Sequence, residues 1–344
     1  MPSFGGRAGR WARELIRPAP PAPATATGAV TATVTTATVT SNGAAPPAVK
    51  LRPPRGRLHA ALVTARPRQW LKNVLVIAAA GAAGALGHDD VPVRVGLAFI
   101  AFCLIASGIY AINDVRDAAE DRNHPRKRHR PVAAGELEPR TALVVGAGLI
   151  VCGLALCLAI RPLLLAVGAG YVALTISYTL VWRRVVVLDV VAIACGFVLR
   201  AVAGGVAAPV TLSRWFIVVI TFSALSVATG KRVAELRRTA ARGLARRGVL
   251  SFYTHARLRL MLLASAAVAL FAYCVWAFEL STIDGVPWRP LTIVPFAACL
   301  ARYAALVQAG HGEAPEELIL RDRWLALVGL VWLVVFALGV HAAS

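Results

Sequence analysis

Long apolar segments, separated by short polar ones, follow one another from Trp70 to the end of the chain. Nine of these segments are long enough, or nearly so, to cross about 30 Å of hydrocarbon as helices. Their predicted bounds are 70–87, 93–112, 141–160, 163–182, 186–206, 214–230, 260–280, 290–308 and 324–342. The pattern predicts an all-α polytopic membrane protein with about nine transmembrane helices.

Residues 1–65 show a different pattern, in which Thr interrupts runs of small apolar residues and Pro and Arg flank them on both sides. A segment without large apolar side chains cannot build a core. We therefore expect a disordered, low-complexity tail over residues 1–65 and a membrane-embedded domain over residues 66–344.

The composition supports a membrane protein and argues against nucleic acid as a partner. Hydrophobic residues make up 58% of the chain and charged residues 16%, and the mean hydropathy is +0.66. Soluble domains carry about 25% charged residues. The formal net charge of +20 would favour nucleic acid in a soluble protein. Neither zinc-finger spacing nor a basic helix with heptads accompanies it, so we predict no nucleic-acid partner.

The distribution of basic residues predicts the orientation of the helices. Twenty basic residues lie in loops on the N-terminal side of the predicted membrane domain, and four lie on the opposite side, at Arg94, Arg161, Arg214 and Arg289. Basic residues accumulate in cytoplasmic loops. We therefore predict that the N-terminus and the basic loops face the cytoplasm, in a multi-pass protein of the plasma membrane.

A group of carboxylates lies at the cytoplasmic end of the second predicted helix. Asp114, Asp117 and Asp121 are spaced i, i+3, i+7, which puts them on one face of a helix. Three like charges on one face repel one another, and a hard divalent cation such as Mg²⁺ removes that cost while binding substrate phosphates. The alternative is a helix end whose Asp residues pair with neighbouring Arg and Lys.

Two further features favour the metal. A basic segment with Arg122, Lys127 and Arg130 follows the carboxylates at once, and acidic and basic groups together suit a magnesium-bridged diphosphate. Asp189 lies near the start of the fifth predicted helix, on the same face of the membrane, where an acidic residue indicates function. A structural ion pair with Arg200 is the alternative for Asp189.

Other polar residues on this side are weaker candidates, because isolated charges near helix ends are often solvated. They are Lys72, Asn73, Tyr178, Arg183, Arg184, Lys231, Arg232 and Glu235.

The segment from Asn113 to Asp121 resembles the NDxxDxxxD motif of the UbiA superfamily of intramembrane prenyltransferases. The resemblance covers roughly residues 66–344 and implies a nine-helix catalytic domain around a central cavity that opens to lipid. Two positions depart from the pattern. Arg183 stands where a lysine is expected, and Ile193 stands where a second Asp would follow Asp189.

Within the superfamily, the chain is most similar to an actinobacterial branch that transfers phosphoribose to decaprenyl phosphate for cell-wall arabinan precursors. The segments that carry this similarity are 66–73, 121–131, 196–200, 230–235 and 315–323. The implied reaction moves 5-phosphoribose from 5-phosphoribosyl 1-diphosphate to a long polyprenyl phosphate and releases diphosphate. The implied partners are these two substrates and the membrane, and an oligomer is compatible with the sequence.

The resemblance implies roles for individual residues. Asp114, Asp117 and Asp121 would hold Mg²⁺ against the leaving diphosphate, and Asp189 would hold a second ion or ribose hydroxyls. The residues implied in substrate binding are Lys72, Asn73, Asn113, Arg122, Lys127, Arg130, Tyr178, Arg183, Arg184, Arg200 and Lys231.

Two other functions remain open at this stage. A UbiA-type enzyme that joins a polyprenyl diphosphate to an aromatic acid or quinone precursor would use the same carboxylates. A transporter is disfavoured, because the charges gather at one face and no predicted helix carries an acidic relay at its middle.

Overall fold

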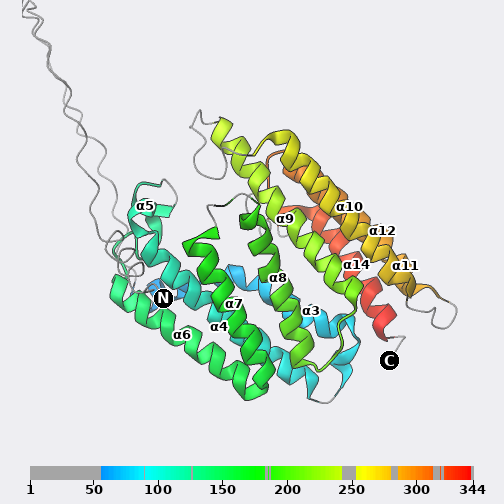
Figure 1. The fold of residues 1–344 in the computed structure, drawn as a ribbon, viewed down its shortest axis with the longest axis horizontal. Coiled ribbons are helices and arrows are strands. Elements are labelled where there is room, and N and C mark those ends of the chain that lie inside the picture. Colours follow the sequence, from blue (N-terminus) through cyan, green and yellow to red (C-terminus); the bar gives the residue numbers. More distant parts are fainter. Residues whose placement is uncertain are drawn as a thin grey trace, which may run out of the picture. The chain divides into compact units, whose positions relative to one another are not determined.

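The computed structural model describes residues 56–88, 90–124, 127–182, 185, 187–241, 253–279, 286–312, 318 and 321–341. Every regular element in these ranges is a helix (Figure 1). The first half contains α2 (Arg57–Ala65), η1 (Pro67–Asn73), α3 (Val74–Ala82), η2 (Ala85–Gly87), α4 (Val91–Arg116), α5 (Ala118–Arg122), η3 (Lys127–His129), α6 (Pro139–Ile160) and α7 (Pro162–Leu180). The second half contains α8 (Leu188–Ala207), α9 (Arg214–Ala241), α10 (His255–Glu279), α11 (Trp288–Leu291), α12 (Ile293–Gln308) and α14 (Arg323–His341).

The predicted membrane helices are confirmed in outline. Among the described residues, eight helical stretches are long and apolar enough to cross a membrane: α4, α6, α7, α8, α9, α10, α11 with α12, and α14. The first predicted helix, 70–87, differs. It consists of the 3-10 helix η1, the nine-residue α3 and the short η2. Gly84, with φ of 70°, separates α3 from η2, because a left-handed residue cannot continue a helix.

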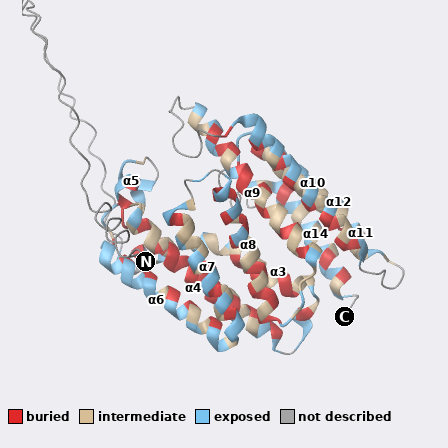
Figure 2. Cartoon of the chain, viewed as in Figure 1, coloured by how far each residue is buried: buried red, intermediate tan, exposed pale blue. Residues whose placement is uncertain are grey.

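Helix α8 lies at the centre of the bundle and packs against α3, α7 and α9, whereas α4 packs chiefly on α6 and α9 on α10. Buried residues lie mainly on the faces that these helices turn toward one another (Figure 2). One apolar cluster, with Phe102, Ile105 and Leu164 among its members, joins α4, α6, α7 and α8. An aromatic cluster around Tyr273 and Trp276 joins α9, α10, α12 and α14.

Glycines set how closely some helices approach. A Cβ on Gly204 of α8 would lie 1.9 Å from the carbonyl oxygen of Val76 in α3, and one on Gly108 of α4 would lie 2.4 Å from that of Gly146 in α6. No larger residue fits at these positions without displacing backbone. Small residues at such interfaces let membrane helices pack backbone to backbone. The contact at Gly204 holds η1 and α3 against α8, which matters for the site below.

The boundary of the tail differs from the one we predicted. Residues 57–65 form α2, which packs on α4. Ala60 of α2 is buried in a small cluster with Ala118, Val132 and Ala142. The rest of the predicted tail, residues 1–55, lies outside the described residues.

Candidate active site

Two buried carboxylates, Asp114 and Asp121, lie together where α4 passes into α5. The helix is interrupted only at Asp117, with φ of −89° and ψ of 0°. The backbone hydrogen bonds from Asp117 N to Asn113 O (2.9 Å) and from Asp121 N to Asp117 O (2.8 Å) continue the helical pattern. Asp114 and Asp121 therefore stay on a common face, as the spacing predicted. Asp117 is partly exposed at the interruption.

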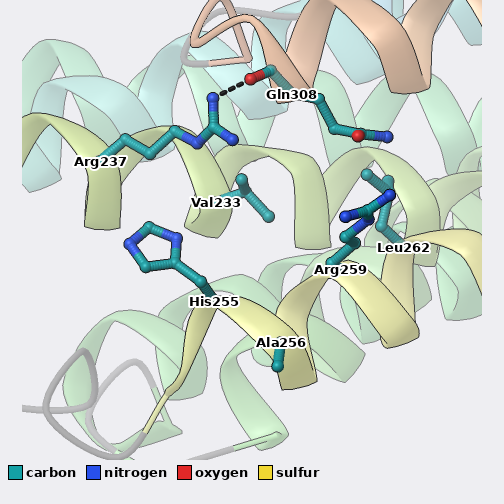
Figure 3. Close-up of a pocket in the computed structure, with 7 residues that line it drawn as sticks. All are labelled: Val233, Arg237, His255, Ala256, Arg259, Leu262 and Gln308. Carbon is teal, nitrogen blue, oxygen red and sulfur yellow. Dashed lines mark hydrogen bonds between the residues drawn. The ribbon is translucent and has the colours of Figure 1, made fainter.

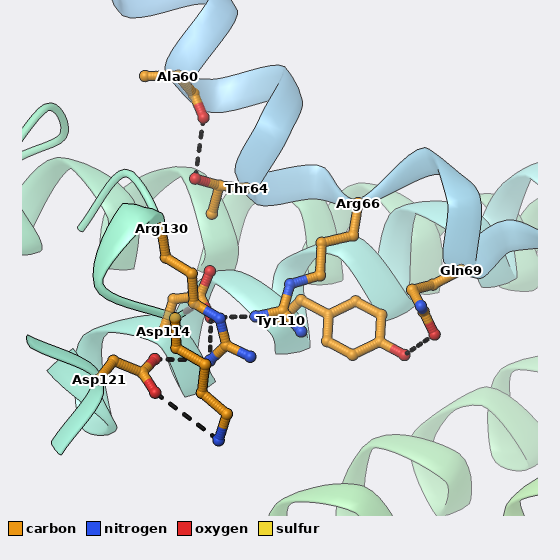
Figure 4. A network of polar contacts seen from close by, with 9 residues as sticks. Ala60, Thr64, Arg66, Gln69, Tyr110, Asp114, Asp121 and Arg130 are labelled. Carbon is orange, nitrogen blue, oxygen red and sulfur yellow. Dashed lines mark hydrogen bonds and ion pairs between the residues drawn. The ribbon is translucent and has the colours of Figure 1, made fainter. Parts of the chain in front are cut away.

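Arginine side chains converge on this pair of carboxylates (Figure 4). Nη1 of Arg130 lies 2.6 Å from Oδ2 of Asp121 and 3.4 Å from Oδ1 of Asp114. Arg66 forms a second ion pair with Asp114, and Nζ of Lys127 lies 3.8 Å from Asp121. Because both carboxylates are 2% exposed, these cations offset the large cost of burying negative charge. The guanidinium of Arg130 thus contacts both carboxylates.

No third acidic side chain among the described residues completes a metal-binding group with these two carboxylates. Within the described part of the chain, no three His, Cys, Asp or Glu side chains are grouped so as to hold a metal ion. The site comprises two buried carboxylates with guanidinium groups between them.

Polar side chains of η1 lie along α4 beyond Asp114 and form what we call the polar tract. Gln69 accepts hydrogen bonds from Lys72 Nζ (2.5 Å) and from the Tyr110 hydroxyl (3.5 Å). On another side of η1, the Trp70 indole donates to Ser107 at 3.1 Å and the Asn73 amide donates to Cys103 at 3.2 Å. The predicted residues Lys72 and Asn73 therefore both lie on this tract.

Arg200 lies at the deep end of the tract, eleven residues beyond Asp189 in α8, or about 16 Å along the helix. Its guanidinium is buried and donates to Asn73 Oδ1 (2.7 Å), the Tyr171 hydroxyl (2.6 Å) and the Gly196 carbonyl (2.8 Å). It also lies 4.7 Å from the centre of the Tyr171 ring. All these partners are neutral. The predicted alternative, an ion pair between Arg200 and Asp189, does not occur.

Asp189 instead pairs with a different arginine. The carboxylate is fully buried, and its two oxygens accept from Arg232 Nε (2.6 Å) and from the Tyr253 hydroxyl (2.9 Å). Burial raises the pKa of Tyr253, so this hydroxyl retains the proton that it donates. Arg232 also contacts Glu235, and the predicted residue Tyr178 lies beside it. The network joins α8, α9 and Tyr253, which lies two residues before α10.

The remaining predicted residues lie around the rim. Asn113 lines a cavity of about 50 Å³ between α4 and α7, next to Arg116 and Thr179. Arg122 is exposed and donates to the Ala133 carbonyl at 3.4 Å. Lys231 is also exposed. Arg183 and Arg184 lie outside the described residues.

Sequence reasoning missed several residues that contact these groups. Arg66 and Tyr253 were not among the candidates and Arg232 was only a weak one, although each pairs with a candidate Asp. Arg66 carries one signal in the sequence, since it is a basic residue directly before a proline at the entry to the first apolar segment. Tyr253 carries none, because its partner is 64 positions away.

The UbiA prenyltransferase family matches residues 74–328, and the chain belongs to this family. The resemblance seen in the Asn113–Asp121 segment is thereby confirmed. The fold agrees. A UbiA homolog from Archaeoglobus fulgidus bound to GPP and Mg²⁺ superposes with a TM-score of 0.62, at 17% identity, covering 82% of this chain and 99% of that one.

Among curated proteins, the chain is similar to decaprenyl-phosphate phosphoribosyltransferases. It is 40% identical to the one from Corynebacterium glutamicum over 298 residues, which cover 85% of this chain and 90% of the relative. The relative from Mycolicibacterium smegmatis is 39% identical, with 82% of this chain and 92% of the relative covered.

Proposed function

We propose that the chain transfers 5-phosphoribose from 5-phosphoribosyl 1-diphosphate to the phosphate of a decaprenyl or similar long polyprenyl phosphate, releasing diphosphate. The product would serve the synthesis of cell-wall arabinan. The observation that carries the proposal is the 40% identity to a decaprenyl-phosphate phosphoribosyltransferase over nearly the whole length of both chains.

The number of cations near the site supports this pair of substrates over the aromatic alternative. A phosphoribosyltransferase must hold three anionic groups: the donor's diphosphate, the donor's 5-phosphate and the acceptor's monophosphate. An aromatic prenyltransferase holds one diphosphate. Arg66, Lys127 and Arg130 lie at the carboxylates, and Lys72 and Arg200 lie along the tract. Guanidinium groups bind phosphate oxygens through paired hydrogen bonds.

The carboxylate pair fits a magnesium ion. Mg²⁺ prefers oxygen ligands from one or two carboxylates together with substrate phosphates. Asp114 and Asp121 are close enough for one cationic centre, Arg130, to contact both, and we propose that they hold Mg²⁺ with Asp117 beside them. The bound ion would neutralise charge on the departing diphosphate. Arg66 and Arg130 would then contact donor phosphates.

Little proton chemistry is required of the protein. The phosphate oxygen of the acceptor is already an anionic nucleophile, so no strong general base is needed. Asp189 already accepts hydrogen bonds on both oxygens, from Arg232 and Tyr253. We propose that it fixes these side chains and Tyr178 at the site, in preference to binding ribose or a second ion directly.

A paired assay tests the substrates. The full-length protein, given radiolabelled phosphoribosyl diphosphate, polyprenyl phosphate and Mg²⁺, is expected to form a labelled lipid, because its cations suit the more anionic substrates. Polyprenyl diphosphate with 4-hydroxybenzoate is expected to give no product. The reverse pattern would refute phosphoribosyl transfer and leave the fold intact.

We also propose that the Asp114 end of the bundle faces the cytoplasm across the plasma membrane. Cysteine labelling of intact cells tests this orientation. Asn123→Cys is expected to resist an impermeant thiol reagent and His88→Cys to react, since both positions are exposed but lie at opposite ends of α4. The unsubstituted chain gives the background from its own six cysteines. Labelling of Asn123→Cys from outside would reverse the orientation.

A further inference from the structure

A cavity of about 420 Å³ lies between the ends of α9, α10 and α12, separate from the carboxylate pair. These ends are on the Asp114 side of the bundle, since α9 and α12 finish there and α10 begins there. Arg237 and Val233 reach it from α9, His255, Arg259 and Leu262 from α10, and Gln308 from α12 (Figure 3). The volume lies within the range of about 300–1,000 Å³ that is common for small-ligand sites.

The polar lining of this cavity is basic. Arg237 donates to the backbone carbonyl of Gln308, which holds its guanidinium at the cavity wall. None of the described residues that line the cavity is acidic. The nearest acidic residue on α9, Glu235, pairs with Arg232. Among the described residues, Arg237 and Arg259 form no ion pair, so their charge is available to an anion.

Three further lining residues, Val233, Ala256 and Leu262, are apolar, and the cavity lies where three membrane-spanning stretches end. Val233 and Leu262 are buried in its wall. Next to it on α10, Leu260 and Leu263 are 69% and 41% exposed, on the part of the helix that enters the membrane. A free phosphate would use only the cations. A lipid would place its phosphate on the cations and its chains over the exposed leucines.

We propose that this cavity binds the phosphate headgroup of an anionic phospholipid, held by Arg237 and Arg259. Basic pockets between transmembrane helices are a known form of headgroup recognition. The lipid would join the ends of α9, α10 and α12 next to Tyr253, which lies two residues before α10 and contacts Asp189. The inference is independent of phosphoribosyl transfer, because it concerns binding in the absence of donor and acceptor.

Native mass spectrometry of the full-length protein in detergent tests the proposal, with phosphatidylglycerol titrated as the probe. The double variant Arg237→Gln/Arg259→Gln is expected to bind it about thirtyfold more weakly, at about 1 kcal/mol for each arginine. The matched control is Arg257→Gln/Arg323→Gln, which removes the same charge from two exposed residues outside the cavity. Its affinity is expected to stay within about twofold of the unsubstituted chain.

Further arms separate the lipid from other sources of phosphate and from misfolding. Phosphatidylcholine, which has no net charge, and inorganic phosphate are each expected to bind at least about tenfold more weakly than phosphatidylglycerol. Arg237→Lys/Arg259→Lys keeps the charge and is expected to retain binding, which shows that the loss in the Gln variant is electrostatic. Equal weakening in both Gln double variants would overturn the proposal. Equal affinity for phosphatidylcholine or for inorganic phosphate would overturn it as well.

Discussion

Asp114→Asn and Asp121→Asn are each expected to lower turnover by about 10²–10³-fold while leaving the protein inserted in the membrane. Each change removes one of two buried carboxylates that converge on the same cationic centre. The site would then hold Mg²⁺ less tightly and stabilise less charge on the departing diphosphate. Initial rates of labelled lipid formation across a Mg²⁺ titration measure the effect, and excess Mg²⁺ is expected to restore activity only in part.

The matched control for this experiment is Asp90→Asn. Asp90 lies at the other end of α4, is 57% exposed and pairs with Arg94. It is therefore expected to retain normal turnover. Asp117→Asn is expected to lower turnover too, and it tests whether the partly exposed third carboxylate takes part. Near-normal rates in both Asp114→Asn and Asp121→Asn would mean that the carboxylates serve only to pair with Arg66 and Arg130.

Arg232→Gln is expected to destabilise the folded protein by about 3–5 kcal/mol, because it leaves the Asp189 charge buried without a cation. Asp189 has no exposed surface, and the Arg232 side chain is 14% exposed. The double variant Asp189→Asn/Arg232→Gln is expected to lose less than the sum of the two single variants, since it buries no charge. Unfolding transitions in detergent, monitored by circular dichroism, provide the four free energies of this cycle.

A second ion pair provides the comparison. Arg302 pairs with Asp322 at 2.7 Å at the same end of the bundle, but the arginine side chain is 41% exposed. Exposed ion pairs contribute little to stability, so Arg302→Gln is expected to change unfolding far less than Arg232→Gln. Activity separates the two roles of Asp189. If the double variant regains stability but not turnover, Asp189 acts in the site as well as in the fold. If the free-energy losses of Asp189→Asn and Arg232→Gln simply added up in the double variant, the two side chains would not interact as a buried ion pair.

The sequence contained enough to predict the elements that depend on local pattern. Apolar length predicted the spanning helices, and the spacing of Asp114 and Asp121 predicted their common face, because helical hydrogen bonds continue on both sides of Asp117. The first predicted helix was interrupted because periodicity does not distinguish a 3-10 stretch from an α-helix over a few residues. The glycines near its end do mark the interruption at Gly84.

The partners of the candidate residues were beyond prediction. Arg66 is 48 positions from Asp114, and Arg232 is 43 positions from Asp189. Such contacts depend on which helices lie side by side, and that depends on close backbone approaches such as the one at Gly204. The sequence offered Arg200, in the same helix, as an alternative partner of Asp189. The structure instead gives Arg200 neutral partners on η1 and α7 and on its own helix.

The 3-10 conformation of η1 constrains the number of residues between Arg66 and Val74. With about three residues per turn, Trp70 and Asn73 fall in one row against α4, while Gln69 and Lys72 fall in another. One inserted residue would rotate everything after it by about 120° and advance it by about 2 Å. Neither end can follow, because Arg66 is paired with Asp114 and Val76 lies against Gly204. This stretch therefore works as a spacer of set length between the carboxylates and Arg200, and it tolerates substitution more readily than insertion or deletion.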